Sequence, residues 1–197
     1  MPKDKGTHLT AVEIRQALWM RINRAQTCHD LFRDIDRSAD LNLVKFNRNL
    51  RFFRTCESAL HDATIVAVYS LYETPNDRVG FRQLINAISD EDMPSNLKRE
   101  FLTRVQEIMP AWRKVSIVRN GIVGHQTSRE EPDEVRERAN LTLACVDKVL
   151  AHSRQLLFDI ASSCMDTHVD FMTDTPGAAE RFFSQIAEPM ILKPAEP

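Results

Sequence analysis

Apolar residues recur at helical spacing along most of this chain, and charged or polar residues separate them. The first segment with this pattern covers residues 7–36, and Thr10 and Glu13 near its start have the spacing of a capping box. Its apolar positions are Val12, Leu18, Trp19, Ile22, Leu31, Phe32 and Ile35. An apolar stripe of this length predicts one long helix or a broken pair of helices.

A second amphipathic segment follows at residues 38–77. One apolar stripe runs through it and consists of Leu43, Phe46, Leu50, Phe53, Leu60, Ala63, Ala67 and Leu71. Its second half, "DATIVAVYSLY" at residues 62–72, is apolar nearly all round, which is typical of a helix at the centre of a bundle or at a subunit interface. The turn signal "TPND" at residues 74–77 is expected to end the helix.

The remaining segments also have helical patterns. Residues 80–88 predict a short helix, and residues 97–109 predict a longer one that Pro110 ends or kinks. Acidic residues around Pro132 predict the start of another long helix, because helix N-termini favour both proline and negative charge. A last short helix is expected within residues 175–189.

The amino-acid composition agrees with this helical pattern. Apolar residues make up 43% of the 197 residues, and only five residues are glycine. The fold is therefore expected to be all-α, an antiparallel bundle of four to five main helices with extra short helices. A chain of this length fits a single helical domain over residues 1–197. Residues 1–8 and 190–197 are expected to be flexible tails.

Charge and cysteine content limit the classes of function. The net charge is −2 and the pI about 6.3, so the chain has no overall basic field and any nucleic-acid site must be local. No apolar run is long enough to span a membrane, and no apolar signal core stands near the start. Cys28 and His29 are adjacent, but they lack the second pair that a zinc site needs. A cytoplasmic protein with reduced thiols and no membrane segment is expected.

The stretch "VRNGIVGH" at residues 118–125 contains two of the five glycines and brings Arg119, Asn120 and His125 close together in sequence. One interpretation of the stretch is purely structural. In it, Gly121 is a helix C-cap, and Arg119 faces the negative end of that helix. This interpretation gives His125 no function.

The charge of the neighbouring segments changes sign at this stretch. Residues 97–119 contain six basic and two acidic side chains, whereas residues 129–138 contain three basic and five acidic ones. A solvated helical face is the usual explanation of such charge. The alternative is a local site for a polyanion that ends at residues 118–125.

An arginine, an adjacent polar residue and a histidine a few positions later form the signature of HEPN domains (higher eukaryote and prokaryote nucleotide-binding). The sequence resembles this family, in which four to six residues separate the arginine and the histidine; here residues 120–124 do so. The stretches "ATIVAVYSLYETPND" and "GFRQLINAI" look like those of the abortive-infection U-type (AbiU-like) branch. The resemblance covers roughly residues 40–150.

The resemblance implies a dimerising helical bundle in which the motif residues of two subunits meet in one cleft. Many HEPN domains are metal-independent endoribonucleases that act as toxins or as effectors of phage defence and stress. Here Arg119 would bind phosphate, Asn120 would be a polar helper, and His125 would be the acid or base. The implied partners are RNA, a second copy of the chain and an antitoxin protein, with no cofactor. Thr127 stands where some members carry a tyrosine that a partner nucleotidyltransferase modifies.

The side chains of the motif suit RNA cleavage. RNA carries its own nucleophile, the 2′-hydroxyl, and an imidazole can take its proton while an imidazolium can protonate the leaving oxygen. The planar guanidinium of arginine can bind the scissile phosphate and stabilise the charge that builds there. Two copies across a two-fold axis would supply two arginines and two histidines, which would make dimerisation part of the mechanism.

Several other residues are candidates for RNA binding. Arg113 and Lys114 can contact the RNA backbone, and Trp112 can stack on a base, although a solvated face and a core position are the simpler interpretations. His61 and Asp62 on the apolar helix can line the cleft, or can form a satisfied polar pair within the bundle. The alternative to a ribonuclease is a non-catalytic helical module that uses the same groove to bind a protein or nucleotide.

Overall fold

The fold is described from a computed structural model. It describes residues 9–73, 79–124 and 131–171, together with residues 177, 181 and 185. The tails expected at residues 1–8 and 190–197, and nearly all of the helix expected within residues 175–189, lie outside the described residues.

The described part of the chain is built from seven α-helices and one π-helical turn, with no strand among its residues. Four helices are long and form the main bundle: α1 (Ala11–Leu41), α3 (Leu50–Ser70), α5 (Ser95–Val118) and α7 (Leu143–Cys164). Three are short: α2 (Leu43–Arg48), α4 (Phe81–Ala87) and α6 (Pro132–Ala139). The predicted all-α bundle of four to five main helices with extra short helices is confirmed.

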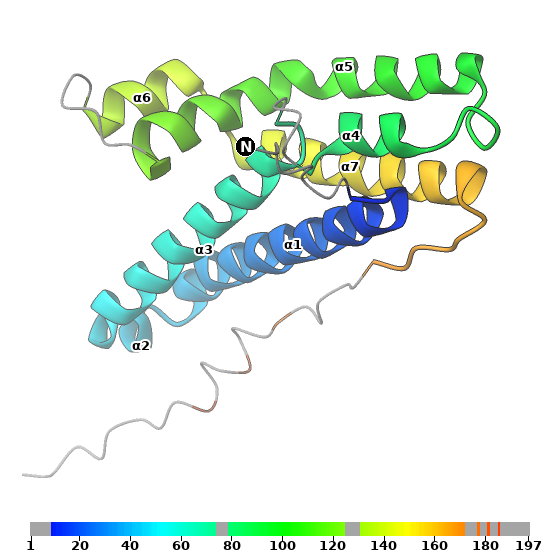
Figure 1. The fold of residues 1–197 in the computed structure, drawn as a ribbon. Helices are drawn as coiled ribbons and strands as arrows, with labels where there is room; N and C mark the ends of the chain where they lie inside the picture. The colour runs from blue at the N-terminus through cyan, green and yellow to red at the C-terminus, as the bar shows by residue number, and fades with distance from the viewer. Residues whose placement is uncertain are drawn as a thin grey trace, which may run out of the picture.

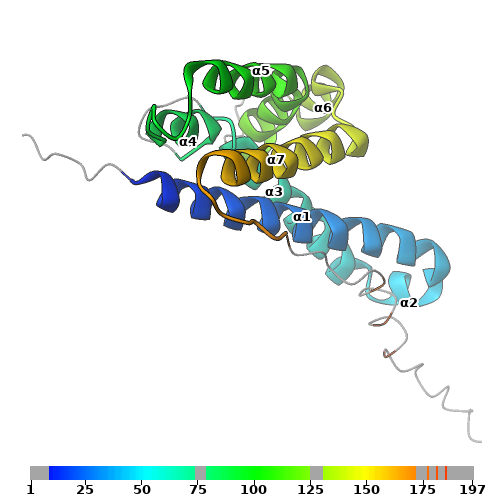
Figure 2. The ribbon, with the colours of Figure 1, turned by 90° about the vertical axis from the view of Figure 1, so that its right-hand side faces the viewer.

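Two antiparallel pairs give the molecule its shape (Figure 1). Helices α1 and α3 run in opposite directions and project beyond the other helices, with α2 at the far end of the projection, which we call the α1–α3 arm (Figures 1 and 2). Helices α5 and α7 form the second pair, and α4 packs against α5 and α1 at the other end of the molecule. The arm therefore leaves one long face of α3 partly uncovered.

A continuous apolar core joins both pairs. Its most deeply buried large side chains are Leu18, Ile22, Ile65, Leu71, Phe81, Leu84, Ile85, Met93, Phe101, Ile108 and Leu150. Burying a side chain of this kind contributes about 1.5–3 kcal/mol, which makes this core the main source of stability. At its centre, Tyr72 Oη and Ser153 Oγ lie 2.9 Å apart, and burial raises the pKa of Tyr72 well above its usual value.

The predicted capping box at the start of α1 is present. The backbone N–H of Glu13 donates to Thr10 Oγ1 over 3.3 Å, and the backbone N–H of Thr10 donates to Glu13 Oε2 over 2.8 Å. These reciprocal bonds satisfy two backbone donors that a helix N-terminus leaves open. The hydrogen bond from the Thr10 backbone also lowers the pKa of the Glu13 carboxyl. From this cap α1 continues to Leu41 as one long helix.

The single stripe expected across residues 43–71 is interrupted. The chain leaves helical geometry at Asn49, between α2 and α3, and Leu43 and Leu50 remain exposed. Phe46 and Phe53 instead stack on each other, with ring centroids 5.1 Å apart, in a small separate cluster at the tip of the arm. The expectation of one continuous stripe was wrong because this short turn changes the direction of the apolar face.

Two further expectations about helix ends need correction. Pro110 was predicted to end or kink its helix, and the end is wrong, because α5 continues to Val118. Pro110 is exposed, so water can satisfy the carbonyl that the proline leaves without a donor. The long helix expected from Pro132 is divided into α6 and α7. Asn140 between them has a left-handed backbone with φ 42°, and Thr142 caps α7 by accepting from the backbone N–H of Cys145.

None of the helices in residues 9–73, 79–124 and 131–171 is both long and apolar enough to cross a bilayer.

Candidate functional site

Residues 118–124 of the motif stretch continue the helical path of α5. After Val118 the chain widens into a π-helical turn, η1 (Arg119–Gly124). Arg119 is the C-cap of α5 and has right-handed helical angles, φ −57° and ψ −47°. The structural interpretation, in which Gly121 is the helix C-cap, is therefore wrong. Such π-helical turns are rare and are found frequently at functional sites.

Gly121 has a packing role instead. A Cβ atom at Gly121 would lie 2.7 Å from Val135 Cγ1 and 3.0 Å from Val135 Cγ2. Val135 is buried on α6, so any side chain at Gly121 would push against the centre of that helix. The absence of a side chain allows α6 to pack directly against η1, next to Arg119.

The guanidinium of Arg119 has two identified contacts. Its Nη1 donates to Oδ1 of Asn120 over 3.0 Å, and its Cζ lies 4.8 Å from the ring centroid of Tyr69 on α3. Asn120 is held in turn, because its Nδ2 donates to Ser116 Oγ over 3.4 Å. The polar neighbour of the arginine therefore orients it, and the tyrosine ring supports it by a cation–π interaction.

Tyr69 is itself held by Trp112, which lies on the neighbouring helix α5. The two rings stack with centroids 5.5 Å apart and an angle of 14° between their planes. Trp112 Nε1 also donates to the carbonyl oxygen of Tyr69 over 3.0 Å. Trp112 thus packs on the protein, in agreement with the core interpretation, and its stacking partner is Tyr69.

Sequence reasoning did not single out Tyr69. Its contact with Arg119 joins residues that are fifty positions apart, and no local pattern marks such a contact. One signal was present: Tyr69 is one of only two tyrosines in the chain, and it stands in the apolar segment at residues 62–72.

The geometry around Arg119 suits an oxyanion of phosphate. A guanidinium has five N–H donors in a planar fork, and the hydrogen bond to Asn120 uses one of them. Arg119 is half-buried and Asn120 is exposed, so the fork lies at the surface while its stem is held. An arginine that is already oriented loses less side-chain entropy on bidentate binding of a phosphate than a freely moving arginine does.

The third predicted motif residue, His125, lies outside the described residues, as does Thr127. The last described residue before it is Gly124 at the end of η1. The acid–base role of His125 stays a prediction.

The predicted RNA-binding residues are not gathered in one place. Arg113 is exposed on α5, whereas Lys114 Nζ donates to the carbonyl oxygen of Asn140 over 3.0 Å and so binds the end of α6. His61 lies eight residues before Tyr69 on α3, a separation of about 12 Å along the helix axis. Tyr69 is the residue that contacts Arg119.

His61 has its own neighbours on the arm. Its Nδ1 lies 3.5 Å from Oδ1 of Asp62, and its ring centroid is 6.0 Å from that of Phe32 on α1. Both side chains of the pair are about half exposed. His61 therefore belongs to the face of the arm and does not contact Arg119.

Within residues 9–73, 79–124 and 131–171, no group of three or more His, Cys, Asp or Glu side chains is placed to hold a metal ion, around Cys28 and His29 or elsewhere. His29 is buried, and its Nε2 lies 2.8 Å from Oδ1 of Asp147 on α7. Arg33 Nη1 also donates to the same carboxylate, over 3.1 Å and 3.2 Å. These contacts tie α1 to α7, so His29 has a structural partner that explains its burial.

The comparison with protein families agrees with the fold. Residues 10–182 match the model of a HEPN family, so this helical bundle is a HEPN protein. Within that class the matched family is AbiU2, and the chain belongs to it. Searches among curated proteins and among solved structures found no match.

Proposed function

We propose that this AbiU2-family chain is a metal-independent endoribonuclease that acts as a homodimer in phage defence or as a toxin. The observation that carries the proposal is the state of Arg119, which is held by Asn120 and Tyr69 on a π-helical turn with its guanidinium at the surface. The RNA-cleaving activity that the HEPN resemblance implies needs an arginine placed in this way.

In the proposed mechanism Arg119 binds the scissile phosphate through its remaining N–H donors. Negative charge grows on the equatorial oxygens as the 2′-hydroxyl attacks, and a pre-oriented guanidinium stabilises that charge with little reorganisation. Asn120 keeps the arginine in place and is itself exposed enough to donate to the same phosphate.

His125 takes the proton of the 2′-hydroxyl or protonates the leaving 5′-oxygen, and one imidazole can do only one of these at a time. A second copy of the chain supplies the second imidazole. The proposed active unit is therefore a homodimer in which two η1 turns face a single RNA phosphate.

Cleavage of labelled single-stranded RNA in EDTA tests the proposal. Wild-type protein is expected to cleave, Arg119→Ala to lose at least a hundredfold in kcat/KM, in the range found when one transition-state donor is removed, and His125→Ala to be inactive. Arg99→Gln is the matched control, because it removes one charge from an exposed residue of α5, twenty residues before Arg119, without touching the Arg119 contacts. Equal cleavage by Arg119→Ala and wild type would contradict the proposal.

The exposed apolar side chains on the arm favour a second candidate, a non-catalytic module for a protein or nucleotide partner such as an antitoxin. Large apolar residues cluster at its tip with much of their surface exposed: Leu41 71%, Leu43 58%, Val44 65%, Leu50 43% and Phe52 56%. Clusters of this kind commonly mark binding surfaces. For this candidate, Phe52→Ser abolishes partner binding and no RNA is cleaved at any protein concentration.

A further inference from the structure

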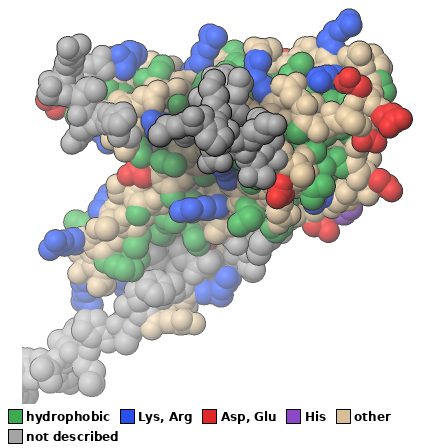
Figure 3. All heavy atoms as spheres, in the orientation of Figure 1, with side chains coloured by type: hydrophobic (Ala, Val, Ile, Leu, Met, Phe, Trp, Pro, Cys, Tyr) green, Lys and Arg blue, Asp and Glu red, His purple; other side chains and the backbone are tan. Residues whose placement is uncertain are grey.

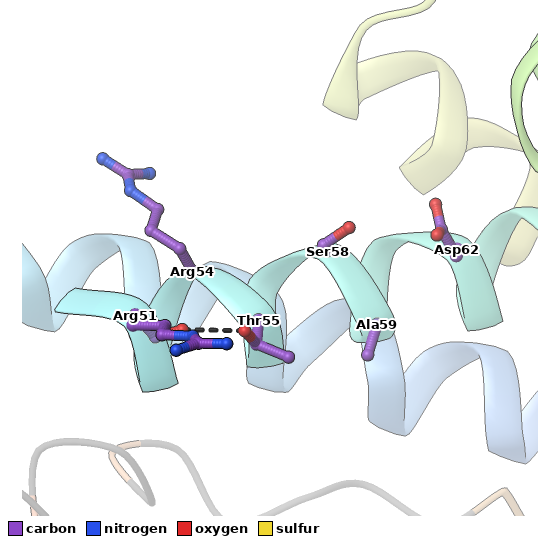
Figure 4. Close-up of a pocket in the computed structure, with 6 residues that line it drawn as sticks. All are labelled: Arg51, Arg54, Thr55, Ser58, Ala59 and Asp62. Atoms are coloured by element: carbon purple, nitrogen blue, oxygen red, sulfur yellow. Dashed lines mark hydrogen bonds between the residues drawn. The ribbon is translucent and has the colours of Figure 1, made fainter. Parts of the chain in front are cut away.

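A shallow depression of about 500 Å³, widely open to solvent, lies along one face of α3, and all the residues that line it belong to that helix. Two rows of side chains line it, each with a spacing of four residues: Arg54, Ser58 and Asp62 in one row, and Arg51, Thr55 and Ala59 in the other (Figure 4). We call these six residues the α3 groove. Its lining is polar or small, with arginines at one end and a carboxylate at the other.

The α3 groove faces the same way as Tyr69. Arg51 precedes Tyr69 by eighteen residues, which is five full turns of an α-helix, or about 27 Å along its axis. Asp62 precedes Tyr69 by seven residues, or close to two turns. Because the Arg119 guanidinium lies over the Tyr69 ring, the groove begins about two turns from the proposed phosphate site and leads away from it.

The far end of the groove is basic. Residues 41–56 contain Lys45, Arg48, Arg51 and Arg54, while Asp40 and Glu57 flank this stretch and Glu57 pairs with Arg54. Figure 3 shows Lys and Arg side chains spread along the projecting arm. The overall charge of −2 hides this local concentration, which is the kind of footprint that a polyanion needs.

The two arginines of the α3 groove make different contacts. Arg54 Nη1 donates to the buried carboxylate of Glu57 over 2.9 Å, and its Cζ lies 5.4 Å from the Phe46 ring centroid, so it also supports the arm. The side chain of Arg51 is exposed and lies beside Thr55 in Figure 4. Arg51 is therefore the residue to alter when binding is to be separated from folding.

We propose that the α3 groove binds the backbone of single-stranded RNA and extends the Arg119 site along the arm. This rests on the proposed ribonuclease function. Arg51 neutralises one phosphate, and Arg54, whose charge is paired with Glu57, offers its remaining N–H donors to another. The hydroxyl of Ser58 donates to a backbone oxygen between them and Arg119. Asp62 repels the phosphates nearest to it and so weakens binding. Charge and hydroxyl groups without large apolar side chains suit a phosphodiester chain better than a protein segment.

The proposal predicts a dependence on RNA length. A dinucleotide bound at Arg119 cannot reach Arg51, about 27 Å away, whereas a strand of roughly 12 nucleotides can, a length within the range that single-strand binding folds cover. Only the longer RNA should therefore respond to a change at Arg51.

Binding of fully 2′-O-methylated RNA, which lacks the attacking hydroxyl, tests the proposal on the full-length chain by fluorescence anisotropy. Arg51→Gln is expected to weaken binding of the strand of about 12 nucleotides several-fold and to reduce the slope of log K against log salt by about 0.7, the value for one phosphate contact in a single strand. Binding of the dinucleotide, measured by competition, should be unchanged. Asp62→Asn should tighten binding of the longer strand, a gain that misfolding cannot produce.

Arg99→Gln is the matched control. Arg99 is exposed on α5, twenty residues and about 30 Å before Arg119. Arg99→Gln therefore removes one positive charge, as Arg51→Gln does, at a similar distance from Arg119 but on a different helix. Equal effects of Arg51→Gln and Arg99→Gln, or no tightening by Asp62→Asn, would overturn the groove proposal and leave the cleavage chemistry untouched. If Arg119→Ala abolishes cleavage while Arg51→Gln leaves RNA binding unchanged, the ribonuclease proposal stands and the groove proposal fails.

Discussion

The Arg119 guanidinium lies 4.8 Å from the ring centroid of Tyr69, a residue from a different helix that stacks on Trp112. This relationship turns a surface arginine into a positioned one. Helix α5 ends next to the last turns of α3, and the tyrosine ring fills the space between them. A cation–π contact at a partly exposed position contributes about 0.5–2 kcal/mol.

Tyr69→Leu tests this support. The change removes the ring and retains an apolar side chain, so we expect kcat/KM for RNA cleavage to fall about tenfold, the equivalent of about 1.4 kcal/mol. Tyr69→Phe keeps the ring and should stay within about twofold of wild type. A similar fall for both variants would mean that the hydroxyl, and not the ring, matters.

Gly121→Ala should destabilise the protein. Its Cβ would lie 2.7 Å from Val135 Cγ1, and crowding of this kind costs about 1–3 kcal/mol. Urea unfolding measures the loss. In the double variant with Val135→Ala the clash is removed, so the combined loss should be smaller than the sum of the two single losses. Simple additivity would show that η1 and α6 are not in direct contact in solution.

Stability should fall in mild acid because of His152 on α7. Burial lowers its pKa, and the nearby charges of Arg104 and Lys148 act in the same direction. The unfolded chain therefore binds a proton at His152 more readily than the folded chain does. Neutral His152 makes its full contribution to the free energy of unfolding above the ordinary histidine pKa of 6.5, and that contribution is lost as the pH falls below this value.

The difference between wild type and His152→Gln isolates this residue from the other histidines. We expect the free energy of unfolding of wild type to decrease more than that of His152→Gln between about pH 7.5 and pH 5.5. Parallel curves for the two proteins would contradict the assignment.

Cys145 and Cys164 should differ in reactivity. A hydrogen bond from the Thr142 hydroxyl to Cys145 Sγ, 3.3 Å long, lowers the pKa of that thiol, with the charges of Lys114 and Lys148 adding to the effect. Burial raises the pKa of Cys164. Because the thiolate is the reactive form, iodoacetamide should modify Cys145 well before Cys164 at about pH 7.5.

A hydroxyl comparison checks the cause. Thr142→Ser keeps the donor and should leave the alkylation rate of Cys145 nearly unchanged, whereas Thr142→Ala should slow it. Both variants alter the N-cap of α7, so their unfolding free energies are measured alongside the alkylation rates. Equal rates in both variants would exclude the hydroxyl as the cause.

Most of the fold could be predicted from the sequence because the helices and their caps depend on residues that are close together in the sequence. Thr10 and Glu13 stand three residues apart and form the capping box that their spacing predicts. Helical periodicity likewise predicted the bundle. Of the two outcomes predicted at Pro110, a helix end or a kink, the helix end was wrong, because a proline ends a helix only when its lost hydrogen bond is not compensated, and that depends on its exposure.

The candidate site was only partly predictable. Arg119 and Asn120 could be found because they are adjacent, whereas Tyr69 comes from another helix. Gly121 was misread because a glycine that caps a helix and a glycine that allows close packing look the same in a sequence. The distinction lies in Val135, fourteen residues further along, whose methyl groups occupy the space of the missing Cβ.

We propose that Arg119 and His125 cleave RNA through its own 2′-hydroxyl. The most direct measurement uses a strand that is 2′-O-methylated everywhere except at one nucleotide, incubated with wild-type protein in EDTA. We predict cleavage at that nucleotide alone, with a 2′,3′-cyclic or 3′-phosphate end, and none with Arg119→Ala. Cleavage of the fully methylated strand, or an intact strand after incubation with a folded dimer, would contradict the account.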